Sequence, residues 1–246
     1  DVEDLIKPED MVVTLSHAGY AKRLSLETYK VQRRGGVGVI GATTKDEDFV
    51  ERLFVANTHD SLLIFTNKGR GHWLKVHQLP EGSRTAQGKA LVNLVSLATG
   101  ELVRTVIPIR EFRDDQFLVF ATKNGIVKKT ELSAYSRPRV GGIIALTLDE
   151  GDDVVEVART DGKQEIILAT RAGYAVRFPE EDARSIGRTS RGVRGITLEK
   201  GDAVVSMVIA KPGETLLTVT ANGFGKRSPV DDYRVIGRGG KGVITI

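Results

Sequence analysis

The sequence predicts an all-β fold, a propeller-like ring of four-stranded blades, on three observations. A hairpin motif, in which a glycine turn separates an apolar run from a basic strand, recurs five times in 246 residues. The repeats are roughly 50 residues long, which is enough for four short strands each. The strand-like runs are rich in β-branched residues, and no apolar stretch keeps a helical period over a dozen residues. The turn glycines are Gly19, Gly69, Gly125, Gly173 and Gly223.

Each repeat begins with a predicted β-hairpin. Its first strand is an apolar run, and its second strand follows a turn that contains Gly. Asn-Gly between β-prone runs is a strong hairpin signal, because both residues tolerate positive φ. The five apolar runs are 12–15, 62–65, 118–121, 166–169 and 216–219.

A loop rich in Arg and Gly follows each hairpin and leads into another short strand. An acidic turn such as 149–153 comes next, and a fourth strand such as 154–158 or 204–210 completes the repeat. The five loops span 33–38, 83–89, 136–142, 187–193 and 237–243.

We expect the repeats to form a single domain, residues 1–246. Each repeat alone would leave an apolar face in water, and its neighbours can cover that face. The fifth repeat stops before its acidic turn and fourth strand, so it is incomplete. The approximate repeats are 11–60, 61–116, 117–164, 165–214 and 215–246.

Basic charge is sorted within every repeat. The segments from each hairpin turn through the following loop hold 27 of the 36 Lys and Arg residues but 8 of the 32 Asp and Glu residues. If the charges only solvated the surface, the basic residues would not fall in the same part of every repeat. Equivalent positions in a ring of repeats share one part of the surface, so we expect a continuous basic belt. Such a belt suits the nucleic-acid backbone, because each phosphate neutralised by Lys or Arg releases counterions. An acidic protein or a lipid surface is the alternative ligand.

The belt is expected to hold and bend duplex DNA without reading its bases. Nothing in the sequence resembles a recognition helix, and aromatic residues are too few for a single-strand stacking platform. Many phosphate contacts along a rigid curved edge can offset the cost of bending a duplex. The side chains expected to line this basic rim are Lys22, Arg23, Lys68, Arg70, Lys75, Arg84, Lys89, Lys128, Lys129, Arg137, Arg139, Arg171, Arg177, Arg188, Arg191, Arg194, Lys226, Arg227, Arg238 and Lys241.

The composition argues against catalysis and metal binding in this chain. It has no Cys, which removes disulfides, zinc fingers and thiol chemistry. The run 82–89 resembles a phosphate loop only faintly, because its spacing is wrong and Ala90 replaces the Ser or Thr. His72 and His77 lack a third metal ligand. The carboxylate pairs are expected at turns, where Asp is favoured; they are Asp114-Asp115, Asp152-Asp153 and Asp231-Asp232.

The stretch Gln32-Arg33-Arg34-Gly35-Gly36-Val37-Gly38 matches the seven-residue gyrase A box. With the five repeats, it makes the chain resemble the C-terminal DNA-wrapping domains of bacterial DNA gyrase A subunits. The resemblance implies a β-pinwheel, usually of six blades where five are visible here, and it assigns all seven residues of the box to DNA binding. The Arg residues present forked donors to phosphate oxygens, and the Gly residues let backbone N–H groups approach closely. A tight turn between blades is the alternative role for Gly35-Gly36.

The same resemblance implies a part in a larger enzyme. DNA would wrap positively around the rim and so allow an ATP-dependent type II topoisomerase to introduce negative supercoils. ATP and Mg²⁺ would bind elsewhere, so we expect no cofactor and no enzymatic activity in this chain. The implied partners are double-stranded DNA and, in an A2B2 complex, the rest of the gyrase A subunit with the gyrase B subunit. The implied location is the bacterial cytoplasm, at the nucleoid, without a membrane, and no apolar run reaches the roughly 18 residues of a membrane helix.

Two other functions stay open. The chain could be the C-terminal domain of topoisomerase IV, in which the box is lost or degraded, and the intact box favours gyrase over this. It could also be a propeller-type protein-interaction module whose basic belt meets an acidic partner. Binding to DNA that weakens steeply with salt would distinguish gyrase and topoisomerase IV from such a module.

Overall fold

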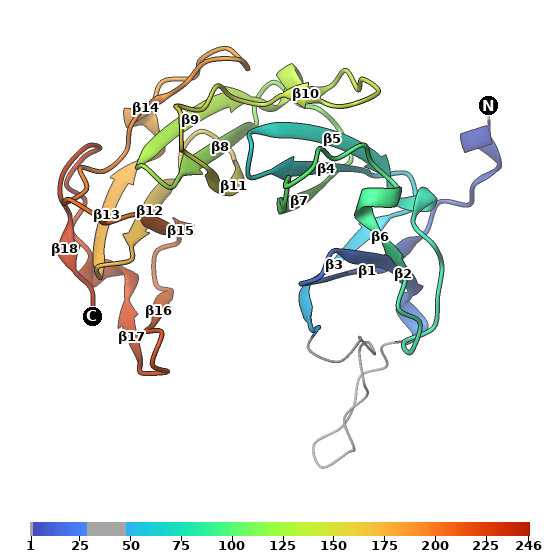
Figure 1. Cartoon of the computed structure of the whole chain (residues 1–246), viewed down its shortest axis with the longest axis horizontal. Coiled ribbons are helices and arrows are strands. Elements are labelled where there is room, and N and C mark those ends of the chain that lie inside the picture. Colours follow the sequence, from blue (N-terminus) through green and yellow to red (C-terminus); the bar gives the residue numbers. More distant parts are fainter. Residues whose placement is uncertain (1, 29–47) are drawn as a thin grey trace. The chain divides into compact units, whose positions relative to one another are not determined.

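The computed structural model describes residues 2–28 and 48–246, and these contain β-strands, short 3-10 helices and turns but no α-helix. They group into two units, each described by itself. The first unit comprises Asp1–Ile64, His72–Glu111 and Arg139–Gly142, and the second comprises Phe65–Gly71, Phe112–Pro138 and Ile143–Ile246. Figure 1 shows the strands of each sheet.

Four four-stranded antiparallel sheets and one two-stranded sheet are present among the described residues. The first, in the order β3-β1-β2-β6, contains β1 (Asp10–Ser16), β2 (Tyr20–Ser25), β3 (Val50–Asn57) and β6 (Lys89–Ala90). The second, in the order β10-β5-β4-β7, contains β4 (Ser61–Thr66), β5 (Arg70–Lys75), β7 (Val103–Ile109) and β10 (Ile143–Ile144).

The remaining sheets repeat this plan. The third, in the order β11-β8-β9-β14, contains β8 (Phe117–Thr122), β9 (Ile126–Glu131), β11 (Val154–Thr160) and β14 (Val193–Arg194). The fourth, in the order β15-β12-β13-β18, contains β12 (Glu165–Thr170), β13 (Tyr174–Pro179), β15 (Val204–Ala210) and β18 (Val243–Ile244). The fifth pairs β16 (Thr215–Val219) with β17 (Gly225–Pro229). The 3-10 helices are η1 (Val2–Leu5), η2 (Leu26–Thr28), η3 (Val76–Gln78), η4 (Leu91–Asn93), η5 (Leu132–Tyr135), η6 (Glu180–Asp182) and η7 (Val230–Asp232).

Each four-stranded sheet borrows one edge strand from the following repeat. The hairpin forms the two central strands, and the fourth strand of the same repeat pairs with the first hairpin strand. The other edge is a two-residue strand from the Arg- and Gly-rich loop of the next repeat, as where Val193 pairs with Val127 and Val243 with Ala175. The prediction of repeated four-stranded antiparallel sheets is confirmed, and the loops prove to be sites of strand exchange.

The five predicted hairpins are all present, and their turns share one hydrogen bond. A Ser or Thr hydroxyl three residues before the turn glycine accepts the N–H of the residue after it. Thr122 Oγ1 accepts from Ile126 N at 3.1 Å, and Thr170 Oγ1 accepts from Tyr174 N at 3.2 Å. The turn glycines have φ between 75° and 88°, a region that L side chains rarely adopt. This shared chemistry explains why the turn recurs in the sequence.

The acidic turns are also structural, because their Asp side chains hold the hairpin turns. Asp152 Oδ1 accepts the N–H groups of Asn124 and Asp153, both at 2.9 Å. Asp202 Oδ1 accepts those of Ala172 and Ala203 in the same way. These two aspartates therefore fix the hairpin turns of their repeats.

Aliphatic side chains of successive sheets fill the core of each unit. In the second unit, Val119 and Val127 of one sheet pack with Ile166, Leu168 and Phe178 of the next. The first unit has a corresponding core that joins residues of β1 to residues of β4, including Val13, Leu15, Leu62 and Ile64. Each repeat thus covers the apolar face of its neighbour within a unit.

Candidate nucleic-acid interface

Twenty basic side chains are expected on the rim, and the structure places most of them at least partly at the surface. Four are half-buried, namely Arg70, Lys75, Arg84 and Arg188. Eleven are exposed, namely Lys68, Lys89, Arg137, Arg139, Arg171, Arg191, Arg194, Lys226, Arg227, Arg238 and Lys241.

The other five depart from the expectation, because their side chains lie mostly inside. The Arg23 side chain is only 18% exposed, and Lys22, Lys128, Lys129 and Arg177 are buried. All five sit on the second strand of a hairpin. In β9, which lies between β8 and β14 in its sheet, every residue except Glu131 is buried, so side chains on both faces of the strand are covered.

Two buried lysines hold the Arg- and Gly-rich loop of the following repeat. Lys22 Nζ donates to the carbonyl oxygens of Ser83, Arg84 and Ala86, at 3.0, 2.8 and 2.6 Å. Lys128 Nζ donates to the carbonyl of Arg188, to that of Ala145 at 2.5 Å and to Tyr135 Oη at 3.1 Å. Burial lowers the pKa of Lys22. The Nζ groups of Lys22 and Lys128 therefore hydrogen-bond to loop carbonyls and are not available to bind a ligand.

The next basic position on the second hairpin strand, Lys129 or Arg177, also contacts protein groups. Lys129 Nζ lies 3.2 Å from Glu180 Oε1 and 4.6 Å from the centre of the Phe117 ring. Arg177 Nε donates to Glu165 Oε2 at 2.6 Å, and its Nη1 donates to the Val230 carbonyl at 2.9 Å. These buried side chains are engaged by protein groups, and we exclude them from the interface.

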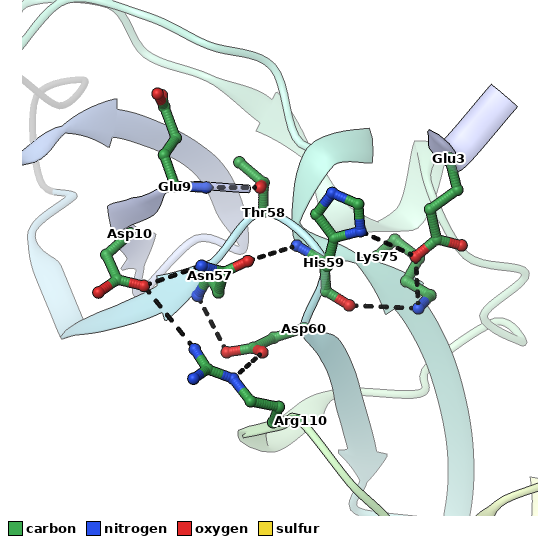
Figure 2. A network of polar contacts seen from close by, with 9 residues as sticks. All are labelled: Glu3, Glu9, Asp10, Asn57, Thr58, His59, Asp60, Lys75 and Arg110. Atoms are coloured by element: carbon green, nitrogen blue, oxygen red, sulfur yellow. Dashed lines mark hydrogen bonds and ion pairs between the residues drawn. The ribbon is translucent and has the colours of Figure 1, made fainter. Parts of the chain in front are cut away.

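Lys75 is engaged by the N-terminal segment of the first unit (Figure 2). Its Nζ donates to Glu3 Oε1 at 2.9 Å and to the His59 carbonyl at 3.2 Å. His59 Nδ1 lies 3.6 Å from the same Glu3 oxygen. The Lys75 hydrogen bond holds the pKa of the Glu3 carboxyl below its usual value. Binding a phosphate at Lys75 would require this ion pair to open.

The Arg- and Gly-rich loops of the second unit are hydrogen-bonded to one another from repeat to repeat. We call residues 143–148, 186–198 and 236–245 the stacked loops. Thr147 Oγ1 donates to the Thr189 carbonyl, and at the equivalent position Thr197 Oγ1 donates to the Gly239 carbonyl, both at 2.7 Å. The stacking therefore places equivalent residues of successive repeats in equivalent surroundings.

Basic side chains of the stacked loops make two kinds of contact. Arg188 Nη1 donates to the Ile144 carbonyl, and Arg238 Nη1 donates to the equivalent Arg194 carbonyl at 2.6 Å. These acceptors are neutral, so the loops keep the positive charge. Arg191 and Lys241 instead meet carboxylates, and the Arg194 side chain is exposed with no ion pair to any described residue.

Two further exposed arginines were absent from the expected rim. Arg184 and Arg234 are both exposed and occupy equivalent places just before the stacked loops. The sequence carries a signal for them, since the pattern Arg-x-Ile-Gly-Arg occurs at 184–188 and again at 234–238. Together with Arg194, they form a set of exposed cations on consecutive repeats.

A family model described as "DNA gyrase C-terminal domain, beta-propeller" matches the chain over residues 10–57, 60–110, 116–161, 164–211 and 214–246. The chain belongs to this family. The resemblance inferred from the gyrase A box and the repeats is thus confirmed, and so is the all-β, propeller-like fold class.

Named relatives of the chain agree with this family. The DNA gyrase A subunit of Salmonella typhimurium is 50% identical over 195 residues, which are 79% of this chain and 22% of that protein. The chain therefore corresponds to a minor part of the curated relatives it matches. A crystal structure of the C-terminal domain of DNA topoisomerase IV has a TM-score of 0.83 and 34% identity, and covers 97% of this chain and 73% of its own. A DNA gyrase A C-terminal domain structure has a TM-score of 0.74 and 28% identity, with 96% and 76% covered.

The gyrase A box, Gln32–Gly38, lies outside the residues that the structure describes. Its role in DNA binding therefore stays a prediction from the sequence.

The structure also bears on the weaker motifs of this domain. In the phosphate-loop-like run 82–89, three carbonyl oxygens converge on Lys22, so the loop surrounds a cation rather than an anion. His72 is buried, with its Nε2 3.9 Å from Glu101 Oε1. Within residues 2–28 and 48–246, no group of three His, Asp or Glu side chains could hold a metal ion. None of the helices in these ranges is long and apolar enough to cross a membrane.

Proposed function

We propose that this chain binds duplex DNA through the phosphate backbone, irrespective of sequence, and bends it. The observation that carries the proposal is the set of exposed cations in or just before the stacked loops of consecutive repeats, on a chain of the DNA gyrase C-terminal domain family. These cations are Arg184, Arg194 and Arg234. Stacked loops present these charges from a rigid hydrogen-bonded frame. A rigid array of cations suits an evenly charged polyanion, because it needs little ordering when the ligand binds.

The mode of binding follows from the elements that carry the charge. Among the described residues, the cations stand on loops and short strands, and no α-helix is available to enter a major groove. Contacts to phosphates fix the position of a protein on DNA but carry no base information. Sequence preference should therefore come only from the ease with which a sequence bends.

We further propose that the bound DNA wraps with positive handedness and that the chain serves a gyrase A subunit in this way. The cleavage of DNA and the hydrolysis of ATP with Mg²⁺ would reside elsewhere in an A2B2 assembly with gyrase B subunits, in the bacterial cytoplasm at the nucleoid. Family membership and the intact Gln32–Gly38 box support the gyrase assignment. The high TM-score to a topoisomerase IV domain makes topoisomerase IV the second candidate.

Binding to a fluorescent duplex, measured by anisotropy over a series of salt concentrations, tests the proposal. We expect the association constant to fall about 10³-fold or more between ~50 and ~200 mM salt, as for six or more phosphate contacts. Two duplexes of unrelated sequence should bind almost equally. Binding that ignores salt would instead favour a module for an acidic protein partner.

Wrapping is tested by sealing relaxed circular DNA with ligase in the presence of the chain. We expect a shift in linking number that Arg33→Ala with Arg34→Ala reduces more than Arg159→Ala with Lys163→Ala, which removes the same charge outside the basic segments. Both variants lose two charges, so a difference between them isolates the box. Equal shifts would remove the special role of the box, and no shift in the unaltered chain would favour bending without a wrap, the topoisomerase IV alternative.

A further inference from the structure

We propose that Asp149 and Glu199 restrain two basic side chains of the stacked loops and thereby lower the affinity of the chain for DNA. The inference rests on the proposed function, and it concerns how strongly rather than whether DNA is bound. The carboxylates act as internal competitors of the phosphates for Arg191 and Lys241.

The two ion pairs have favourable geometry. Arg191 binds the Asp149 carboxylate through two hydrogen bonds. Its Nε donates to Oδ1 at 2.6 Å, and its Nη2 donates to Oδ2 at 2.5 Å. Lys241 Nζ lies 2.9 Å from Glu199 Oε1. The hydrogen bond from Arg191 lowers the pKa of Asp149, and the hydrogen bond to Glu199 raises the pKa of Lys241. Each shift favours the charged form of the group concerned, as a close ion pair does.

The pairs occupy the same place in consecutive repeats. Arg191 and Lys241 each precede a glycine with positive φ, Gly192 and Gly242. Each carboxylate comes from the preceding repeat, immediately after Leu148 or Leu198, at the start of an acidic turn. The recurrence argues for a built arrangement, since an accidental surface pair has no reason to repeat in register.

Both partners of each pair are open to solvent, which makes them accessible to a phosphate. The side chains of Arg191 and Asp149 are 49% and 42% exposed, and those of Lys241 and Glu199 are 70% and 58% exposed. A phosphate that takes either cation must displace a carboxylate and then lies close to it. Arg188 differs, because the Ile144 carbonyl that it meets carries no net charge to repel a phosphate.

The test compares two double variants that lose the same negative charge. In Asp149→Asn with Glu199→Gln, both competitors are removed. In Glu150→Gln with Glu181→Gln, two exposed carboxylates are removed that have no ion pair with any described residue of the chain. The control is needed because any loss of negative charge strengthens DNA binding through the long-range field.

We expect Asp149→Asn/Glu199→Gln to bind duplex DNA roughly threefold to tenfold more tightly than the control variant at ~100 mM salt, the range for breaking two exposed ion pairs. Its log–log salt dependence should steepen by up to about 1.8, since each released cation adds about 0.9. Equal affinity of the two variants would overturn the inference, and weaker binding by Asp149→Asn/Glu199→Gln would overturn it too, by showing that the carboxylates position the cations for DNA.

The proposed function fails separately, through the unaltered chain. If that chain shows no salt-dependent DNA binding, DNA is not the ligand. If the unaltered chain binds DNA but the two double variants have equal affinity for it, the ion pairs do not affect DNA binding. Thermal unfolding of each variant checks folding, and we expect small shifts because exposed ion pairs add little stability.

Discussion

Lys128→Met lowers the free energy of unfolding by about 2–4 kcal/mol near pH 8, the largest loss of stability expected from one basic residue of this chain. The Lys128 side chain is fully buried, and its Nζ lies within hydrogen-bond distance of two backbone carbonyls and the Tyr135 hydroxyl. The neutral amine that prevails near pH 8 keeps two N–H donors for the two carbonyls. Met keeps most of the aliphatic volume but leaves these oxygens without their common donor. Urea unfolding followed by circular dichroism measures the loss.

The cost of this substitution should grow with pH. Burial, and then the nearby Arg188 guanidinium, lowers the pKa of Lys128 to about 7, whereas a lysine in an unfolded chain has a pKa of about 10.4. Between these values the unfolded chain binds more protons at this residue, so the stability of the unaltered protein rises with pH. Its slope should exceed that of Lys128→Met by up to about 1.4 kcal/mol per pH unit.

Lys163→Met is the matched control, because Lys163 is an exposed lysine of the same unit. We expect a change within about 0.5 kcal/mol and no altered pH slope. If Lys128→Met were as stable as the control at pH 7 and at pH 9, Lys128 would hold no loop in place.

The largest expected effect on DNA binding comes from replacing Arg184, Arg194 and Arg234 together by Ala. These side chains are exposed on consecutive repeats, and each is expected to meet a phosphate. We expect an affinity loss on the order of 100-fold at ~100 mM salt and a log–log salt slope that is shallower by about 2.7. Anisotropy titrations over a salt series measure both quantities.

A triple variant of equal charge serves as the control. Arg159, Lys163 and Lys211 are exposed cations of the second unit that lie outside the basic segments of the repeats. Replacing them by Ala should reduce affinity through the long-range field alone and leave the salt slope nearly unchanged. Equal effects of the two triple variants would mean that net charge, and not the stacked loops, governs binding.

Much of the architecture could be predicted from the sequence, because its signals are local. The hairpins recur with a turn glycine and a Ser or Thr three residues earlier, and both groups act within one turn. The strand exchange was implied by the resemblance to β-pinwheel domains. It does not follow from local signals, since the donated strands, such as β14 and β18, are only two residues long. A pairing of that length leaves no periodicity to detect.

The basic rim was predicted less well, because charge in a sequence does not reveal which face of a strand is covered. Lys128 and Lys129 read as surface cations, yet both sides of β9 are packed and both ammonium groups have protein partners. In contrast, Arg184 and Arg234 stand beside buried residues, Ala183 and Tyr233, in segments that read as ordinary loops. The repeated Arg-x-Ile-Gly-Arg pattern marks both arginines in the sequence, but their exposure is established only by the structure.

The exchange of strands between repeats has a consequence for how such a chain can gain or lose a unit. A cut at the junction of two repeats would take away the hairpin of one sheet and also the edge strand of the sheet before it. A duplication or deletion that keeps every sheet intact must therefore start within one blade and end at the matching point of another. Changes in blade number should then occur in whole, phase-shifted segments, and trimming from either side of a junction should damage two blades at once.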